Sequence, residues 1–370
     1  MFKRKKEKKP VWNLPRNLTE LGYLINEEGQ LRTIKDNEPY VFDLKEKAYN
    51  EALYDVIIDL LGEWVEEKLV SDVGMLRILL PLGATETDIH TKIYATPDYQ
   101  KNEKMMVFIP GTAHTVGIWS RRVLTDTSIV DGSMITYAKR AISMGYSVVI
   151  CNPNEVFWYK GKGVLILPRA NVSFDAIPGS ESPEEHTAYV FEHIIIPSPA
   201  KKIFTIANSY GGHCAINSIQ TFFDELKDRV KAIEFTASTH SIDFVKTDKL
   251  KVWIHEHCRN WIMSDLPVGK EVLDTRFGCV SLSSGAELNE YVVAAAIDQV
   301  FDFIDRKSKL PDNWHESMMA EEIEEDTPEQ LDLEAQRLFA DNSLVNDVQD
   351  KIQFDGYPVL EEVENSAWVQ

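Results

Sequence analysis

The stretch Ile203-Phe-Thr-Ile-Ala207 is a mostly apolar run that leads directly into Asn208-Ser-Tyr-Gly-Gly212. A short run that ends at a turn signal is typical of a buried strand, and the residues that follow are patterned as a helix to about Leu226. In α/β-hydrolases the nucleophilic serine occupies such a strand-to-helix turn, with small residues two before and two after it. Ala207 and Gly211 stand at those positions around Ser209. The stretch predicts a nucleophile elbow with Ser209 as the catalytic candidate; a serine in a tight turn without chemistry would have the same pattern.

Further apolar runs and helical stretches alternate on both sides of this elbow. The runs span 105–109, 146–150, 230–235 and 279–282, and helical periodicity covers 47–69, 134–144, 183–195 and 290–305. Short buried strands that alternate with helices are typical of a mostly parallel sheet covered on both faces. We therefore predict an α/β fold of the α/β-hydrolase type, with a small N-terminal module and an acidic C-terminal tail.

The net charge of −20 is distributed unevenly over the 370 residues. Residues 1–10 carry +5, residues 11–310 carry −10 and residues 311–370 carry −15. An acidic body does not suit the phosphate contacts that dominate non-specific nucleic-acid binding, so we do not expect the body to bind nucleic acid directly. The predicted divisions are a basic arm at 1–14, an N-terminal module packed on the core at 15–100, a hydrolase-like domain at 101–309 and an acidic, disordered tail at 310–370. The lysine cluster of the arm fits a nuclear localisation signal or a solvated tail equally well.

Other composition features exclude several classes of protein. Four widely spaced cysteines without a CxxC pair indicate reduced thiols rather than a disulfide framework. No apolar run reaches the length of a membrane span, and the charged N-terminus lacks the apolar segment of a signal peptide. Neither GxGxxG nor GxxxxGK occurs, so we expect no cofactor. The sequence His255-Glu-His-Cys258 fits neither HExxH nor zinc-finger spacing, so we expect no metal site.

A serine nucleophile needs a base, usually a histidine, and a carboxylate that orients it. His240 follows the fourth apolar run and is the histidine at a plausible strand end, with Asp243 just beyond it. His213 lies four residues past Ser209 on the helix and should point along that helix. No histidine occurs between residues 267 and 314. His240 is therefore the candidate base, and a buried structural histidine is the alternative.

The other strand ends supply candidates for the oxyanion hole and the pocket. Pro110-Gly-Thr112 occupies the place of a His-Gly oxyanion loop, although Gly111 fits a simple turn equally well. The helix start after Ser209 directs backbone N–H groups toward a developing oxyanion. The carboxyl ends of parallel strands meet at one edge of a sheet, so we expect residues from several strand ends around the serine. The predicted oxyanion and pocket residues are Gly111, Tyr210, Gly211, Asn152 and Asn154.

Several short motifs follow one another in order along residues 18–305. They are Leu21-Gly-Tyr23, Gly29-Gln-Leu-Arg32, Trp119-Ser-Arg-Arg122, Asn152-Pro-Asn-Glu155, Ser182-Pro-Glu-Glu-His186, Ser209-Tyr-Gly-Gly212 and Cys258-Arg-Asn-Trp261. With these motifs the chain resembles the Arb2 domain family of Argonaute-binding and cotranscriptional-regulator proteins. The resemblance implies an α/β-hydrolase-like domain, residence in nucleus and cytoplasm, and association with Argonaute, small-RNA, heterochromatin or splicing factors.

The resemblance also implies where a catalytic triad would lie, and the chain departs from the family pattern there. Where the family has His, Asp, His and His, this chain has Asn208, Ala237, Ala286 and Pro110; Ser209 and His240 match. Loss of a triad member lowers kcat by on the order of 10⁴. We therefore expect a non-catalytic adaptor. The alternatives are an esterase-like serine hydrolase with Ser209 as nucleophile, and a binding module for a small acyl or nucleotide ligand.

Overall fold

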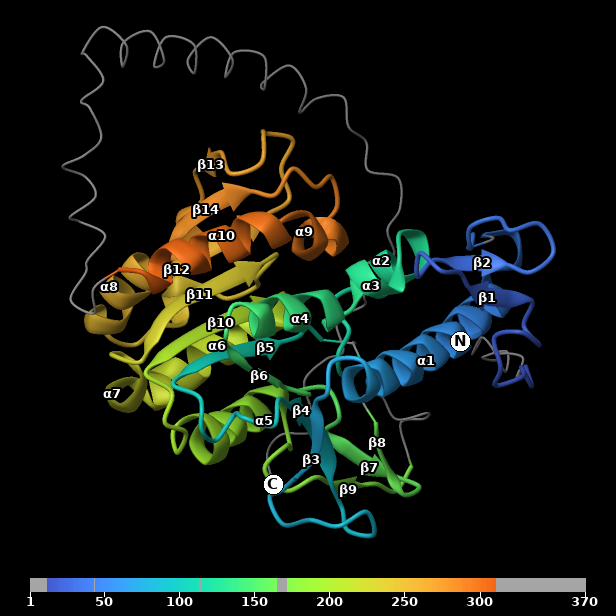
Figure 1. Ribbon diagram of the computed structural model, residues 1–370, viewed down its shortest axis with the longest axis horizontal. Coiled ribbons are helices and arrows are strands. Elements are labelled where there is room, and N and C mark those ends of the chain that lie inside the picture. Colours follow the sequence, from blue (N-terminus) through green and yellow to red (C-terminus); the bar gives the residue numbers. More distant parts are fainter. Residues whose placement is uncertain (1–11, 43, 113–114, 165–171, 311–370) are drawn as a thin grey trace, which may run out of the picture. The chain divides into compact units, whose positions relative to one another are not determined.

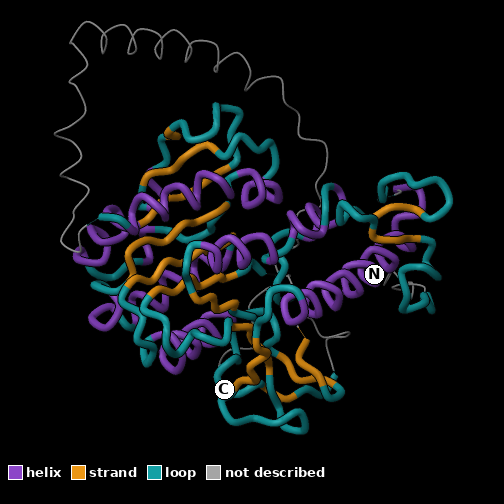
Figure 2. Tube along the Cα trace, viewed as in Figure 1, coloured by secondary structure: helices purple, strands orange, loops and turns teal. Residues whose placement is uncertain are grey.

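The computed structural model in Figure 1 describes residues 12–42, 44–112, 115–164 and 172–310. The predicted basic arm lies largely outside these residues, and so does the predicted acidic tail beyond Leu310. Within the described residues a large sheet is covered by helices, and two small sheets accompany it, as the strands drawn in Figure 2 show.

The central sheet has nine strands in the order β13-β14-β12-β11-β10-β5-β6-β4-β3. They are β3 (Leu76–Leu80), β4 (Thr91–Ala95), β5 (Lys104–Ile109), β6 (Ser147–Ile150), β10 (Lys202–Asn208), β11 (Val230–Thr236), β12 (Cys258–Ile262), β13 (Glu271–Val272) and β14 (Val280–Ser283). The strands from β14 to β6 are parallel, whereas β4, β3 and β13 pair antiparallel with their neighbours. The predicted mostly parallel sheet is confirmed.

Alternate residues of the buried strands belong to two separate cores. On β5, Met106 and Phe108 belong to the first core, and Met105, Val107 and Ile109 belong to the second. Because successive side chains of a strand point to opposite faces, an unbroken apolar run requires that both faces be covered. This is why the apolar runs identified the central strands from sequence.

Helices cover both faces of the sheet. They are α1 (Lys47–Ser71), α2 (Arg121–Asp126), α3 (Ile129–Gly132), α4 (Ile135–Ser143), α5 (Pro183–Val190), α6 (Tyr210–Thr221), α7 (Phe223–Leu226), α8 (Asp248–His257), α9 (Asn289–Ala295) and α10 (Ile297–Ser308). Short 3₁₀ turns occur at η1 (Leu44–Glu46), η3 (Ile242–Phe244) and η4 (Thr275–Phe277), and η2 (Phe191–Ile195) is a π-helical turn. Residues of α1, α4, α9 and α10 pack in the first core, and those of α5, α6 and α8 pack in the second.

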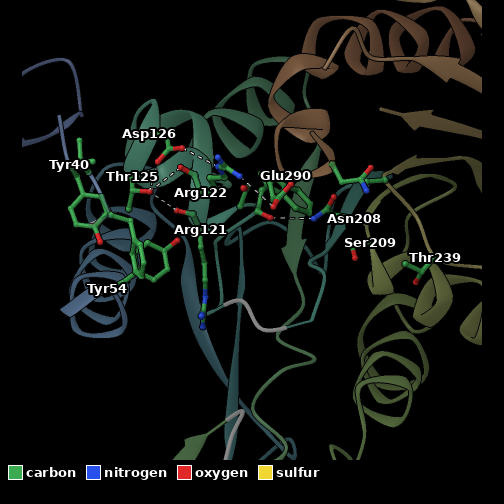
Figure 3. Close-up of a pocket in the computed structure, with 16 residues that line it drawn as sticks. Tyr40, Tyr54, Arg121, Arg122, Thr125, Asp126, Asn208, Ser209, Thr239 and Glu290 are labelled. Atoms are coloured by element: carbon green, nitrogen blue, oxygen red, sulfur yellow. Dashed lines mark hydrogen bonds and ion pairs between the residues drawn. The ribbon is translucent and has the colours of Figure 1, made fainter. Parts of the chain in front are cut away.

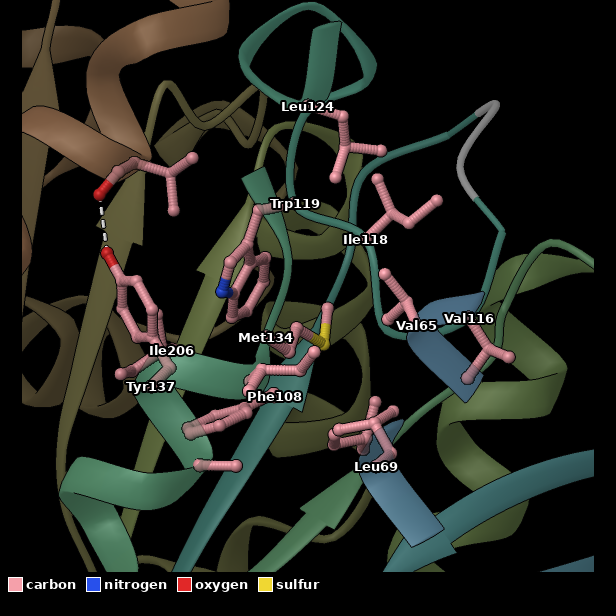
Figure 4. Packing of buried hydrophobic residues seen from close by; sticks show 14 of the residues in the cluster. Val65, Leu69, Phe108, Val116, Ile118, Trp119, Leu124, Met134, Tyr137 and Ile206 are labelled. Atoms are coloured by element: carbon pink, nitrogen blue, oxygen red, sulfur yellow. Dashed lines mark hydrogen bonds between the residues drawn. The ribbon is translucent and has the colours of Figure 1, made fainter. Parts of the chain in front are cut away.

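An aromatic group in the first core holds the loop that leads into α2 (Figure 4). The fully buried Trp119 ring lies 5.6 Å from the Phe108 ring and 5.4 Å from the Tyr137 ring, measured between centroids. The Tyr137 hydroxyl donates a hydrogen bond to the Val293 carbonyl, which ties α4 to α9. This packing fixes where α2 begins, and with it the position of Arg121.

Two small sheets lie outside the central one. The first pairs β1 (Tyr23–Ile25) with β2 (Leu31–Thr33), and the second joins β7 (Phe157–Tyr159), β8 (Lys162–Val164) and β9 (Asp175–Ala176). In the part of the chain that the structure describes, no helix is long and apolar enough to span a membrane.

The structure differs from the sequence prediction at several elements. β3 and β4 lie inside the predicted N-terminal module, yet they belong to the central sheet, so the sheet begins before residue 101. β12 was not predicted because Arg259 and Asn260 interrupt its apolar pattern; the Arg259 guanidinium lies 5.0 Å above the Phe303 ring of α10. The helix predicted at 290–305 is divided into α9 and α10 at Ala296, and the one predicted at 183–195 ends in the π turn η2.

Candidate functional site

Ser209 lies in the predicted turn between β10 and α6, in an uncommon backbone conformation. Its φ is +51° and its ψ is −122°. A positive φ costs a residue with a Cβ roughly 1–3 kcal/mol, so the surroundings must hold the backbone there. The backbone at Ser209 therefore has the geometry of the strand-to-helix elbow that the sequence predicted.

Three glycines let the backbone close tightly around this turn. A Cβ on Gly211 would lie 2.5 Å from the Ile109 carbonyl oxygen, and one on Gly212 would lie 1.9 Å from the Ser238 Oγ. A Cβ on Gly111 would lie 2.8 Å from the Ser209 Cβ. The loop after β5 therefore passes directly over the serine, at the place predicted for the oxyanion loop.

Hydrogen bonds from the two neighbouring strand ends hold the elbow. The Ser209 N–H donates to the Thr236 carbonyl over 2.9 Å, and the Thr239 N–H donates to the Ser209 carbonyl over 3.2 Å. The buried Asn208 amide donates to the Trp119 carbonyl over 3.2 Å and accepts from the Thr236 hydroxyl over 3.0 Å. Asn208, which stands where the resemblance implies a histidine, thus joins the elbow to the first core.

Ser209 forms part of the wall of a pocket of about 810 Å³, drawn in Figure 3. The opposite wall comes from the N-terminal part of the chain through Tyr40 and Tyr54, and Arg121 lies beside Tyr54. We call this the Ser209 pocket. Its volume lies in the range typical of small-molecule sites. Its lining includes Arg121, Arg122, Asp126 and Glu290, and no histidine of the described residues belongs to it.

His240 is buried away from this pocket. Its ring nitrogens contact the Ser238 Oγ at 2.6 Å and the Phe277 carbonyl oxygen at 3.0 Å. Because a carbonyl only accepts, Nε2 carries the proton and donates to Phe277, and Nδ1 accepts from the Ser238 hydroxyl. Burial of the ring lowers the pKa of His240 to about 4, so the imidazole is neutral at pH 7. Both nitrogens are occupied, and the structure does not bring His240 to Ser209.

No hydrogen bond joins the Ser209 hydroxyl to another side chain within the described residues. His213 on α6 lies 3.8 Å from the Glu184 carboxylate, and its ring is tilted against that of Tyr210 with 5.2 Å between the centroids. The Tyr210 hydroxyl donates to the same carboxylate, and this hydrogen bond raises the pKa of Tyr210. Among the residues that the structure describes, the serine therefore has neither the base nor the orienting carboxylate that a triad requires.

The remaining predicted pocket residues support the loops around the serine rather than line the Ser209 pocket. The Asn154 side chain donates to the Gly111 carbonyl over 2.8 Å, which holds the loop that passes over Ser209. The Asn152 N–H donates to His186 Nε2 over 3.0 Å. Burial lowers the pKa of His186 to about 3, and its Nδ1 donates to Ser180 Oγ over 2.9 Å, so His186 is a neutral linker.

The positions where the resemblance implies an acid and a base carry methyl groups. Ala237 follows β11, lines the Ser209 pocket and has a φ of +48°. Ala286, after β14, is buried in the first core. Neither residue can take part in proton transfer.

Several pocket residues were missed from sequence because they come from distant segments. Tyr40, Tyr54, Asp126 and Glu290 belong to four separate parts of the chain. Arg121 and Arg122 appeared only as part of a family-like motif. The motif Trp119-Ser-Arg-Arg122 was the local sequence feature that pointed to the arginines of this pocket.

The structure contains no candidate metal centre among the residues it describes. No group of three or more His, Cys, Asp or Glu side chains there could hold a metal ion. The four cysteines are buried and free.

The chain matches a known domain family and several known proteins. The Arb2 domain family matches residues 14–268. Cotranscriptional regulator ARB2A of Homo sapiens is 27% identical over 347 residues, which cover 82% of this chain and 83% of that protein. The Cotranscriptional regulator ARB2A homolog of Xenopus tropicalis is 29% identical over 346 residues, covering 81% and 82%, and the homolog of Dictyostelium discoideum is 28% identical over 314 residues, covering 78% and 79%.

Solved structures that align with part of this chain include a histone deacetylase and an esterase. The histone deacetylase Clr3 aligns with a TM-score of 0.44 and 13% identity, over 68% of this chain and 39% of that one. Esterase E25 aligns with a TM-score of 0.33 and 11% identity, over 74% and 91%.

Proposed function

We propose, from the premise that this chain belongs to the Arb2 domain family, that it is a non-catalytic regulator of gene expression whose α/β-hydrolase-like pocket serves for binding. In this role it acts as an adaptor for Argonaute, chromatin or splicing factors in the nucleus and cytoplasm. The names of its relatives support a cotranscriptional role. The acidic body supports contact with proteins rather than directly with nucleic acid.

One observation carries the non-catalytic part of the proposal. The elbow places Ser209 at the Ser209 pocket, but His240 donates its Nε2 proton to the Phe277 carbonyl and lines no part of that pocket. A serine hydroxyl without a base is a weak nucleophile at neutral pH. The pocket is thus suited to hold a molecule without transforming it.

The test combines catalysis and binding in one set of proteins. We expect the purified full chain to hydrolyse p-nitrophenyl acetate no faster than Ser209→Ala. We also expect wild type and Ser209→Ala to coprecipitate an Argonaute protein to the same extent. Thr221→Ala, an exposed change on α6, serves as a matched surface control. Turnover that depends on Ser209 would overturn the non-catalytic assignment, and failure of both proteins to retain Argonaute would overturn that partner.

The second candidate function is an esterase-like serine hydrolase with Ser209 as nucleophile and His240 as base. The strained Ser209 backbone favours it, because strain of this kind is concentrated at active sites. The two nitrogens of His240 would have to leave Ser238 and Phe277 before the ring could act as a base. If the protein is such a hydrolase, ester turnover must be lost in Ser209→Ala and also in His240→Gln.

A further inference from the structure

The two arginines at the start of α2 differ in how their charges are balanced. Arg122 lies 3.2 Å from the Asp126 carboxylate and 4.0 Å from the Glu290 carboxylate, and Tyr291 also donates to Asp126 over 2.8 Å. Arg121 has no ion pair within 4.0 Å to any acid in the described segments, and its Nε is buried without a hydrogen-bond partner. A guanidinium with a buried, unpaired donor is costly unless something else satisfies it.

Further hydrogen-bond donors on the same wall also lack acceptors. The Tyr40 side chain is 6% exposed, and its hydroxyl has no partner among the described residues. Trp119 is fully buried, and its Nε1 is likewise without a partner. Both residues line the Ser209 pocket together with Arg121. These two donors lie beneath the pocket wall, out of reach of a bound molecule, so the terminal guanidinium nitrogens of Arg121 are the charged donors that face the Ser209 pocket.

We propose that the Ser209 pocket binds a small organic oxyanion, a carboxylate or a phosphate, with its anionic group on Arg121 and its apolar body against Tyr40 and Tyr54. This inference rests on the proposed binding role of the pocket. The planar guanidinium fork matches both carboxylate and phosphate in a bidentate manner. Figure 3 shows Arg121 extended beside Tyr54, with Ser209 across the pocket.

The walls favour a small molecule with an aromatic or other flat body. Phe42 and Val41 continue the apolar surface beside the two tyrosines. The Tyr40 and Tyr54 rings lie 6.0 Å apart between centroids, which leaves an aromatic wall next to the charge. A volume of about 810 Å³ holds a molecule of drug size.

Isothermal titration of the full chain with three matched probes tests this assignment. The probes are benzoate, phenyl phosphate and the neutral isostere benzamide. We expect at least one anion to bind at least about tenfold more tightly than benzamide, because hydrogen bonds to a charged group are the stronger ones. Tighter binding of benzoate identifies a carboxylate as the natural group, and tighter binding of phenyl phosphate identifies a phosphate.

Variants locate the anion within the pocket. Arg121→Gln should weaken binding of that anion by at least about tenfold, and Arg121→Lys should recover only part of the loss, because lysine keeps the charge without the fork. Tyr40→Phe should leave binding unchanged, because the Tyr40 hydroxyl is buried beneath the wall and out of reach of a bound molecule. Arg276→Gln removes an exposed arginine that is paired with Asp274 and should change nothing.

Three outcomes would overturn the assignment. They are no binding of either anion up to about 10 mM, equal binding of benzamide, or anion binding that a folded Arg121→Gln protein retains in full. Adding Ser209→Ala separates this inference from the proposed function. Ester turnover that requires Ser209, together with anion binding that requires Arg121, would refute only the non-catalytic role. Absence of ester turnover, together with absence of anion binding that requires Arg121, would refute only the assignment of an anionic ligand.

Discussion

Two neighbouring strands of the central sheet end in nearly the same way but carry different chemistry. Ser209 directly follows β10 with a φ of +51°, and Ala237 directly follows β11 with a φ of +48°. Both residues line the Ser209 pocket, and hydrogen bonds between the two strand ends hold both turns. One turn presents a hydroxyl to the pocket, and the other presents a methyl group.

The comparison shows that two turns with nearly the same backbone φ can present different side-chain chemistry to one pocket. The Ala237 N–H donates to the Trp261 carbonyl over 2.8 Å, so the unusual φ there is maintained by the sheet and not by a catalytic side chain. The side chain of His240, three residues further, points toward the second core, where the centroid of its ring lies 4.2 Å from that of the Phe235 ring. The fold preserves the shape of the pocket edge, while the residues at that edge decide whether chemistry occurs.

The largest effect is expected from closing the space around the elbow. Gly211→Ala places a Cβ against the backbone oxygens of Ile109 and Pro110, at 2.5 Å and 2.6 Å. Since backbone cannot move aside easily, we expect the free energy of unfolding to fall by at least about 3 kcal/mol in urea denaturation. Gly22→Ala is the control: it adds a methyl into open space at a φ of +88°, and should cost about 1 kcal/mol from the backbone conformation alone. Equal losses in the two variants would show that the elbow is not tightly packed.

A pH-dependent effect should distinguish the inward His240 from a catalytic histidine. Its folded pKa of about 4 lies below the ordinary value of 6.5, so below pH 6.5 the unfolded chain binds a proton that the folded chain refuses. Stability is therefore unaffected above pH 6.5 and is lost as pH falls from 6.5 toward 4. At pH 5 we expect wild type to have lost about 2 kcal/mol more than His240→Gln, relative to pH 7.

The difference between the two proteins isolates His240 from other titrating groups. Burial raises the pKa of Glu234 to about 8, and this group acts in the opposite direction, gaining stability as pH falls. That contribution is the same in wild type and in His240→Gln, so it cancels. If the free energy of unfolding of the two proteins changed equally between pH 7 and pH 5, the His240 ring would be exposed to water rather than buried.

The smallest effect concerns the strain that the two turns share. Glycine adopts positive φ without a Cβ penalty, so Ala237→Gly and Ser209→Gly should each raise the free energy of unfolding by about 0.5 to 1 kcal/mol. Ser209→Ala keeps the Cβ and should stay within about 0.5 kcal/mol of wild type. Ala215→Gly in the middle of α6 should instead lose at least about 1 kcal/mol. Destabilisation by Ala237→Gly would mean that the methyl group itself is needed there.

The sequence predicted the centre of the fold because its strands are buried on both faces. Unbroken apolar runs at 105–109, 146–150 and 203–207 revealed β5, β6 and β10. The runs failed for β3, which lies at the sheet edge and exposes Leu76, and for β12, whose buried Asn260 breaks the pattern. Tertiary partners decide whether such residues form a strand, and these partners are not visible in a local window.

The place of Ser209 in a strand-to-helix turn was predictable from the sequence, but its surroundings were not. Ser209 was found because a strand, a tight turn and a helix are contiguous in sequence. The orientation of His240 depends on the carbonyl of Phe277, 37 residues away, and the opposite pocket wall depends on where Tyr40 and Tyr54 pack. Such contacts between distant segments follow from the folded core rather than from a motif.

Labelling with a fluorophosphonate probe tests the central claim, that Ser209 is held in a hydrolase elbow without a working base. Full-length wild type, Ser209→Ala and His240→Gln would be treated at pH 7 and analysed by intact-mass spectrometry. We expect no adduct in any of the three proteins, because the probe reacts only with an activated serine hydroxyl. A stoichiometric adduct on wild type that Ser209→Ala and His240→Gln both abolish would contradict the claim and establish an active serine hydrolase.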